Sequence, residues 1–370
     1  MAEDYLLISA DSHFVEPPTM WAERIDRKFR DRAPHTVKDI RGKEGEYFVC
    51  ENIEPMSVAG FFGAGVPSQE LPEHNKKSFA QAPQSVFDPA YRLKDLDRDG
   101  VQAEVIYTSM GMPLFGLDDA ELRAACFGAF NDWAAEYCNY DSKRLIPLGL
   151  ITLEDIPAAV AELGRIAKKG VRGAMIWAEP ADDHPYSAPE YEPFWAAAQD
   201  LNMPLSLHIL TNRSGTGPTL GRNGMLLNLA TMHHAIERTL AVMVYGGVLE
   251  KFPGLKIVSA ENDVGWMAYF MYRLDTVQNR LGVLGGMKLP MRASDYVKRQ
   301  VYATFIADPV FVDLLGRYPA ENVMWSSDYP HTAATFPRSR EIVNKRLGGL
   351  PPDQLRKVVR DTAAKVYGIQ

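Results

Sequence analysis

Short apolar runs alternate along the chain with longer segments that repeat their apolar residues at helical spacing. Eight runs rich in β-branched and apolar residues predict strands, at 5–10, 103–109, 145–151, 171–177, 203–210, 255–260, 301–306 and 322–328. Helical patterns separate most of them, most clearly at 118–138, 156–169 and 232–252. This alternation is typical of a parallel sheet with crossover helices, and eight such units favour an α/β fold, a TIM-like (β/α)₈ barrel.

One interval departs from the alternation. Roughly ninety residues separate the first predicted strand from the second, too many for an ordinary βα connection. This segment, 14–102, contains a glycine-rich stretch at 60–65 and has no sustained apolar periodicity. We therefore expect a single barrel domain over 1–370, in which 14–102 is an insertion that forms part lid and part substrate wall over the active-site mouth.

Composition narrows the class of protein. Hydrophobic residues make up 46% and charged residues 24% of the chain, as in soluble globular enzymes. The net charge of -7 and the lack of a Lys/Arg run argue against nucleic-acid binding. The N-terminal residues do not follow a signal-peptide pattern, and no window approaches the roughly 18 apolar residues of a membrane span. We expect a cytoplasmic enzyme that acts on a small-molecule substrate and binds neither nucleic acid nor membrane.

Four predicted strands end in ionisable side chains. The first ends in Asp11-Ser12-His13, the fifth carries His208, the sixth runs into Glu261, and the eighth ends in Asp328. Barrel strands point their C-terminal ends at the active site. Side chains two residues apart on a strand share a face, so Asp11 and His13 can reach one ion. Imidazole with carboxylate suits Zn²⁺, Mn²⁺ or Fe²⁺, and the pattern predicts such a divalent metal site.

Each of these residues taken alone also fits a structural role. His208 could be a core histidine bonded to a backbone carbonyl, and Asp328 could cap the segment before Pro330. Glu16 either supports His13 or begins the turn that follows it. The convergence of four strand ends favours the metal, because buried charges are costly unless they are paired or bound to an ion.

Longer stretches around these residues resemble the amidohydrolase-related branch of the amidohydrolase superfamily, which includes aminocarboxymuconate-semialdehyde decarboxylase and γ-resorcylate decarboxylase. The resembling segments are 8–18, 92–109, 204–209, 252–266 and 322–331. The resemblance implies a distorted barrel whose metal is held at the strand C-termini by Asp11, His13, His208 and Asp328. It also implies a homo-oligomer, a dimer or higher.

Two positions depart from the pattern of that branch. Some members have His-x-His on the first strand, and the acid at Asp11 favours Mn²⁺ or Fe²⁺ over Zn²⁺. Several members have a histidine where this chain has Glu261. A carboxylate there could be an acid/base of raised pKa, or could bind or bridge a second metal ion. A structural role, capping the next helix through 263–265, is a third alternative.

These features predict a metal-dependent lyase or hydrolase of a small carboxylated or aromatic metabolite. Non-oxidative decarboxylation is marginally favoured, with Asp328 or Glu261 delivering the proton to carbon. The nearest alternative is hydrolysis of a C–N, C–O or C–C bond, with one of the same carboxylates as base. A dinuclear Mn/Fe enzyme that activates O₂ and a non-catalytic partner subunit are the remaining alternatives.

Further candidates lie outside the strand ends. His234, on the predicted helix 232–252, is a weaker catalytic candidate. A guanidinium matches a carboxylate, and aromatic rings can wall an aromatic substrate. On these grounds the substrate-binding candidates are Arg213, Phe61 and Trp177. His331, three residues after Asp328, is a further substrate-binding candidate.

Overall fold

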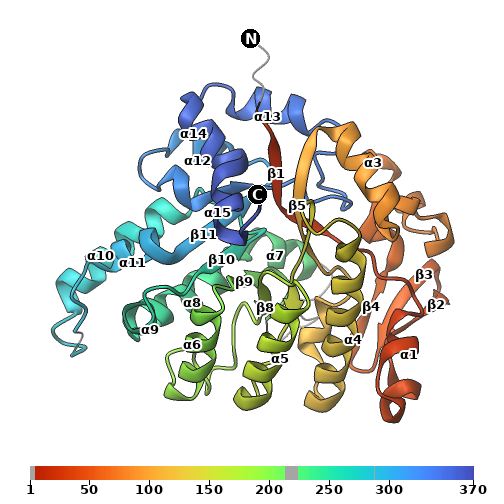
Figure 1. Ribbon diagram of the computed structural model, residues 1–370, viewed down its shortest axis with the longest axis horizontal. Helices are drawn as coiled ribbons and strands as arrows, with labels where there is room; N and C mark the ends of the chain where they lie inside the picture. Colours follow the sequence, from red (N-terminus) through yellow and green to blue (C-terminus); the bar gives the residue numbers. More distant parts are fainter. Residues whose placement is uncertain (1–4, 213–223, 287) are drawn as a thin grey trace.

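The structure, a computed structural model, describes residues 5–212, 224–286 and 288–370. A strand overlaps each of the eight predicted runs, and the third run is broken into two short strands (Figure 1). The parallel strands are β1 (Leu7–His13), β5 (Val101–Tyr107), β6 (Leu145–Pro147), β7 (Gly149–Leu150), β8 (Ala174–Ile176), β9 (Leu205–His208), β10 (Ile257–Ala260), β11 (Val301–Phe305) and β12 (Val323–Trp325). Every residue in them is buried except Gln102, as expected for strands that crossover helices cover.

The parallel strands pair into two sheets rather than one continuous ladder. Their orders are β1-β5-β6 and β12-β11-β10-β9-β8-β7, and Leu148 alone separates β6 from β7. At the other edge, Asp328 N–H donates to Asp11 O at 2.9 Å, and His13 N–H donates to Tyr329 O at 2.7 Å. The chain that follows β12 therefore lies directly against β1, which brings the carboxyl ends of both sheets together.

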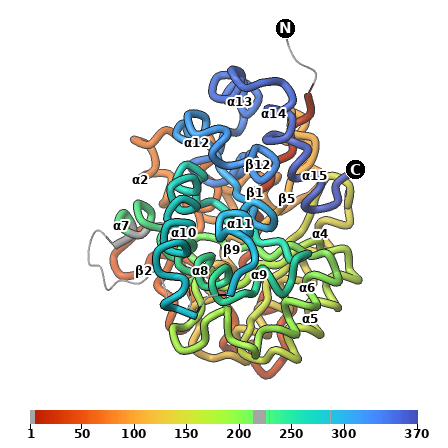
Figure 2. The backbone as a smooth tube through the Cα atoms, turned by 90° about the vertical axis from the view of Figure 1, so that its left-hand side faces the viewer, coloured from red at the N-terminus to blue at the C-terminus, as the bar shows by residue number. Residues whose placement is uncertain are grey.

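Helices lie on the outside of the strands (Figure 1). They are α1 (Met20–Arg24), α2 (Leu71–His74), α3 (Pro89–Asp99), α4 (Ala120–Cys138), α5 (Ile156–Lys168), α6 (Glu192–Asp200), α7 (Gly224–Thr231), α8 (His233–Tyr245), α9 (Val248–Lys251), α10 (Met267–Leu281), α11 (Ala293–Gln300), α12 (Pro309–Asp313), α13 (Ser339–Leu347), α14 (Pro352–Arg356) and α15 (Thr362–Tyr367). The three predicted helical segments are confirmed as α4, α5 and the pair α8 and α9. Figure 2 shows α13 and α14 near the N-terminal end of the molecule and α5 and α6 at the opposite end. Among the helices described, none has the length and apolar character to cross a bilayer.

The segment between β1 and β5 carries a small sheet of its own. Its strands β2 (His35–Ile40), β3 (Lys43–Cys50) and β4 (Ile53–Ser57) pair antiparallel in the order β2-β3-β4. The apolar pattern does not predict this sheet, because β2 and β4 contain no buried residue.

A buried ion pair ties this segment to the parallel strands. The Arg92 guanidinium, on α3, donates to both carboxylate oxygens of Glu104 on β5, at 2.6 and 2.8 Å. It also donates to the carbonyls of His13 at 3.0 Å and Tyr329 at 3.1 Å. Arg92 therefore links α3, β5, β1 and the chain after β12 at the edge where the polar strand ends gather.

Candidate metal centre

Ionisable side chains from four strands meet at the carboxyl ends of the parallel sheets. Asp11 and His13 lie on β1, and His208 is the last residue of β9. Glu261 directly follows β10, and Asp328 lies three residues beyond β12. The five residues that the strand ends single out in the sequence are therefore neighbours in space.

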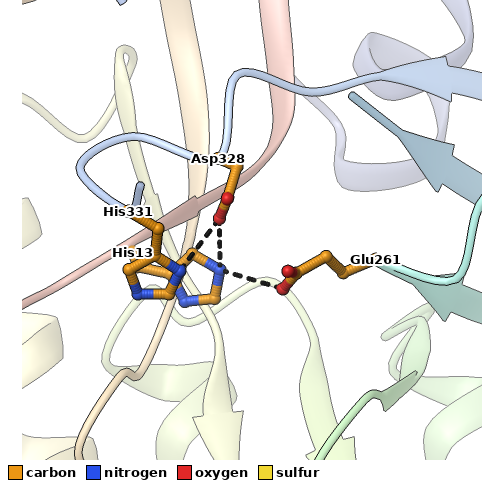
Figure 3. A group of neighbouring side chains, drawn as sticks. All are labelled: His13, Glu261, Asp328 and His331. Carbon is orange, nitrogen blue, oxygen red and sulfur yellow. Dashed lines mark ion pairs between the residues drawn. The ribbon is translucent and has the colours of Figure 1, made fainter. Parts of the chain in front are cut away.

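The facing atoms of this group lie at separations that suit a shared ion. His13 Nε2 is 3.3 Å from Asp11 Oδ1. It is also 3.4 Å from Asp328 Oδ1 and 3.7 Å from Glu261 Oε2 (Figure 3). His208 Nε2 is 3.7 Å from Asp11 Oδ1 and 3.3 Å from Glu261 Oε2. Donors that each sit roughly 2.0–2.2 Å from one metal ion are spaced in this way.

Four atoms of the group are buried and have no hydrogen-bond partner. They are Asp11 Oδ1, His13 Nε2, His208 Nε2 and Asp328 Oδ1. Folded proteins pair nearly all of their buried polar atoms, so four unpaired atoms that face one another call for a ligand. Two nitrogens and two carboxylate oxygens fit a divalent transition metal of the Zn²⁺, Mn²⁺ or Fe²⁺ class.

Both imidazoles are held in the orientation that a metal ligand needs. His13 Nδ1 bonds to the Thr108 carbonyl at 2.8 Å, and His208 Nδ1 bonds to the Ile209 carbonyl at 3.0 Å. Because a carbonyl only accepts, each Nδ1 carries the hydrogen and each Nε2 presents its lone pair to the group. His208 thus bonds to a backbone carbonyl, as a core histidine would, yet its other nitrogen stays available.

Thr304 on β11 connects two of the carboxylate residues. Its hydroxyl donates to Asp11 Oδ2 at 3.0 Å and accepts from Glu261 N–H at 2.8 Å. Glu261 and Asp328 both adopt left-handed backbone, each with φ of 55°. Such backbone is uncommon for residues other than glycine, and it occurs here at both carboxylates that follow a strand.

Another residue, Asp308, caps the turn that Glu261 would cap in the structural alternative. The backbone N–H groups of Val264 and Gly265 donate to Asp308 Oδ2, at 2.9 and 2.6 Å. Asp308 therefore caps this turn, and the Glu261 carboxylate, 19% exposed, faces the imidazoles instead.

Burial without a cation shifts the pKa values of the group. Burial raises the pKa of Asp328 to about 7, although the nearby His13 opposes the shift. Burial, followed by the charges of Asp328 and Asp11, raises the pKa of Glu261 well above its usual range. Burial lowers the pKa of His13 to about 4. Although burial opposes the shift, the nearby His208 and His13 hold the pKa of Asp11 below its usual range. The metal-free group therefore favours protons on Glu261 and Asp328 and keeps His13 neutral, and a cation would displace those protons.

Two of the predicted substrate-binding residues lie beside the group. His331 Nδ1 is 3.0 Å from Asp328 Oδ1, and its ring stacks on that of His13 with centroids 4.0 Å apart. The Phe61 ring lies 6.0 Å from the His331 ring, centroid to centroid. Phe61 comes from the 14–102 segment, so that segment reaches the group.

The other candidates lie elsewhere. His234 is exposed on α8 and lines a cavity of about 240 Å³ with Ile209 and Asn212. Trp177 is buried, donates to the Phe115 carbonyl at 2.9 Å and lines a different cavity, of about 1020 Å³. Within the part of the chain described, His234 is not among the side chains close enough to share an ion. Arg213 falls outside the described residues.

Glu16 supports His13 through the loop that follows β5. Its buried carboxylate accepts hydrogen bonds from the Thr108 hydroxyl, from Ser109 N–H at 3.2 Å and from Met110 N–H at 2.9 Å. It therefore positions the carbonyl to which His13 Nδ1 donates. The polar pair Thr108-Ser109 at a strand end is the sequence signal that would have drawn attention to this loop.

Comparison with known proteins places the chain in a family. The amidohydrolase family model matches residues 10–369. The chain belongs to this family. The γ-resorcylate decarboxylase of Polaromonas sp. strain JS666 is 23% identical over 321 residues, which cover 82% of this amidohydrolase and 94% of that relative. The resemblance to the amidohydrolase-related branch is therefore confirmed.

Solved structures agree in fold. An amidohydrolase from Mycobacterium avium subsp. paratuberculosis superposes with a TM-score of 0.79 at 21% identity, over 99% of this chain and 100% of the other. The 5-carboxyvanillate decarboxylase of Novosphingobium aromaticivorans, with bound manganese, superposes with a TM-score of 0.70 at 18% identity, over 99% and 97%. This amidohydrolase therefore has an α/β fold of the TIM-barrel type.

Proposed function

We propose that this amidohydrolase is a metal-dependent carboxy-lyase, which releases CO₂ without oxidation from a small aromatic carboxylate. The observation that carries the proposal is the set of four unpaired, buried donor atoms at the strand ends. The relatives add support: γ-resorcylate decarboxylase acts in the same reaction class, and the Novosphingobium structure holds manganese with a substituted hydroxybenzoic acid.

Asp11, His13, His208 and Asp328 are the residues that would hold the cation, with Glu261 beside them. Two neutral imidazoles and two carboxylates leave such a site electrically neutral around one divalent ion. The aspartate on β1 favours Mn²⁺ or Fe²⁺ over Zn²⁺. When bound, the cation supplies positive charge against the substrate carboxylate and its neighbouring oxygen.

Loss of CO₂ leaves a carbon that must accept a proton, and two carboxyl groups adjoin the site. We assign the proton to Asp328, which adjoins a histidine outside the predicted ligand set. Its Oδ1 also faces the His331 Nδ1 at 3.0 Å, so a neighbouring base can exchange protons with it. Glu261 is the second candidate for this step.

The surroundings of the site belong to the same proposal. The 14–102 segment would form one domain with the strands and wall the mouth, since Ala64 N–H donates to the Pro330 carbonyl at 2.9 Å. Phe61 and His331 would contact the substrate ring. The strands would close between β1 and β12, where the backbone bonds of Asp11 and His13 already join the two edges.

Other predictions stay as predictions. His234 as a catalytic residue, and Arg213 and Trp177 as substrate contacts, need a bound ligand to be tested. A homodimer and a cytoplasmic location also remain predictions.

The test is a direct product assay. Purified protein would be loaded with Mn²⁺ and incubated with a panel of ortho-hydroxylated benzoates, and CO₂ and the decarboxylated phenol would be measured together. We expect the two products in equal amounts, and none from His208→Ala. His184→Ala is the matched control, because His184 is exposed and bonds to Glu190 at 2.8 Å. A hydrolytic product without CO₂ would overturn the proposal in favour of hydrolysis.

A further inference from the structure

Metal-capable side chains in this site outnumber the ligands that one ion needs. One group that could share an ion is formed by Asp11, His13 and His208, and a second by His13, Glu261, Asp328 and His331. An imidazole nitrogen has a single lone pair, so His13 can serve only one ion. With His13 assigned to the first group, each group offers three ligands, the number that catalytic metal sites commonly take from the protein.

His331 is held as a ligand in the same way as the other two histidines. Ser109 Oγ lies 2.5 Å from the Phe14 carbonyl and must donate to it, because a carbonyl cannot donate. The hydroxyl has one hydrogen, so it accepts from His331 Nε2 at 2.8 Å. His331 Nδ1 therefore carries a lone pair and points it at Asp328 Oδ1, 3.0 Å away.

Charge gives a second, independent argument. Three carboxylates, those of Asp11, Glu261 and Asp328, are buried or mostly buried in one place. Among the described residues, their ion-pair partners are histidines only. With all three ionised, one divalent cation would leave a net negative charge in a site shielded from water, and two would leave a positive charge that a substrate carboxylate would offset. The unpaired, fully buried Asp328 Oδ1 lies between the two groups and faces both His13 and His331.

We infer that the site binds two divalent cations, the second held by Glu261, Asp328 and His331 beside the one held by Asp11, His13 and His208. The inference rests on the proposed metal site and deepens it: Figure 3 shows Asp328 and Glu261 pointing toward His13, with the ring of His331 stacked on that of His13. Asp328 lies at the shared edge and contributes to both sites. Cations that bind imidazole and carboxylate together, such as Mn²⁺, Fe²⁺ or Zn²⁺, fit both positions.

The second ion changes the roles of the two carboxyl groups. Glu261 and Asp328 would both become ionised ligands. A carboxylate has two oxygens, so either residue can bind through one oxygen and exchange a proton through the other. Both therefore stay candidates for the proton transfer.

Metal stoichiometry tests the inference without an activity measurement. Chelator-treated full-length protein would be titrated with Mn²⁺ alone, and bound metal counted by mass spectrometry and followed by electron paramagnetic resonance. We expect two Mn²⁺ per chain at saturation, with the signal of an exchange-coupled pair, because two ions in one such site lie roughly 3.5–4 Å apart. Saturation at one Mn²⁺ per chain, with an uncoupled six-line signal, would overturn the inference.

Variants separate this inference from the proposed function. His331→Ala should bind one Mn²⁺ and lose the coupled signal, and Ser109→Ala should weaken the second site while it leaves the first intact. His184→Ala should keep both ions. One Mn²⁺ in the unchanged protein together with CO₂ release would refute the second ion and leave the proposed function standing. Two Mn²⁺ without CO₂ release from the substrate panel would do the reverse.

Discussion

Two sets of buried charged side chains lie a short way apart in this protein, and they are satisfied in opposite ways. Arg92 and Glu104 form a complete pair, in which both carboxylate oxygens and the guanidinium have partners. In the metal centre, Asp11, His13 and Asp328 each keep a buried atom with no partner. Both sets carry the cost of burial, and only the first offsets it from within the chain. A buried charge that is paired within the protein links secondary-structure elements. A buried polar atom without a partner indicates a ligand-binding site.

The largest effect is expected from removing a ligand of the metal centre. His208→Ala should abolish bound metal and activity, because His208 Nε2 is one of the four unpaired donor atoms. The fold should survive, since the hydrogen bond of the His208 imidazole goes to the carbonyl of the adjacent Ile209 and links no distant elements. Metal analysis and circular dichroism of the variant would check both expectations. A folded His208→Ala protein that binds as much metal as the unchanged protein would show that the unpaired atoms are not metal ligands.

Breaking the self-satisfied pair should affect stability instead. Arg92→Met leaves the Glu104 carboxylate buried without its partner, and we expect a loss of about 3–5 kcal/mol in the free energy of unfolding. The double variant Arg92→Met with Glu104→Leu should lose less than the single variant, because no charge stays unpaired. Urea unfolding of both proteins measures the difference. Equal losses would show that the bonds from Arg92 to the His13 and Tyr329 carbonyls dominate.

A smaller effect is expected from the hydroxyl that positions Asp11. Thr304→Val keeps the shape of the side chain and removes the bonds to Asp11 Oδ2 and Glu261 N–H. Metal affinity should fall by roughly 10–100-fold, the usual consequence of losing a group that orients a ligand. Competition with a chelator would measure it, and an unchanged affinity would mean that burial alone orients Asp11.

The smallest expected effect is a change in the stability of the metal-free protein with pH. Burial raises the pKa of Glu16 and of Asp328 to about 7, above the ordinary values of 4.5 and 3.8. Above pH 6.5, the ordinary histidine pKa, His13 is mostly neutral in the unfolded chain, and its pKa of about 4 keeps it neutral in the folded chain as well. The folded metal-free chain then binds more protons than the unfolded chain, so its stability should fall between pH 6.5 and about 8.

Metal should reverse that trend. Ligands bind a cation in their deprotonated form, so Mn²⁺ affinity and the Tm gained from Mn²⁺ should rise over the same pH window. Thermal melts of chelated and Mn²⁺-loaded protein across the window would show the two slopes. A metal-free Tm that rises with pH would refute the assignment of protons to these acids.

The sequence by itself determined the positions of the strands and the candidate metal ligands at the ends of β1, β9 and β12. Each predicted strand overlaps an observed one, because apolar runs between helical segments report burial locally. Asp11, His13, His208 and Asp328 were recognisable because the carboxyl ends of parallel strands gather at one edge whatever the details of packing.

Only the tertiary structure decided what supports and extends that site. Thr304 reaches Asp11 across 293 positions of the chain, and Ser109 reaches His331 across 222, so no local pattern reports either contact. Glu261 could equally have capped the next turn, until Asp308 was seen to occupy that role and left-handed backbone was found at Glu261. Residue type and spacing indicate where polar groups gather; which lone pairs stay unpaired depends on distant partners, which only folding brings into contact.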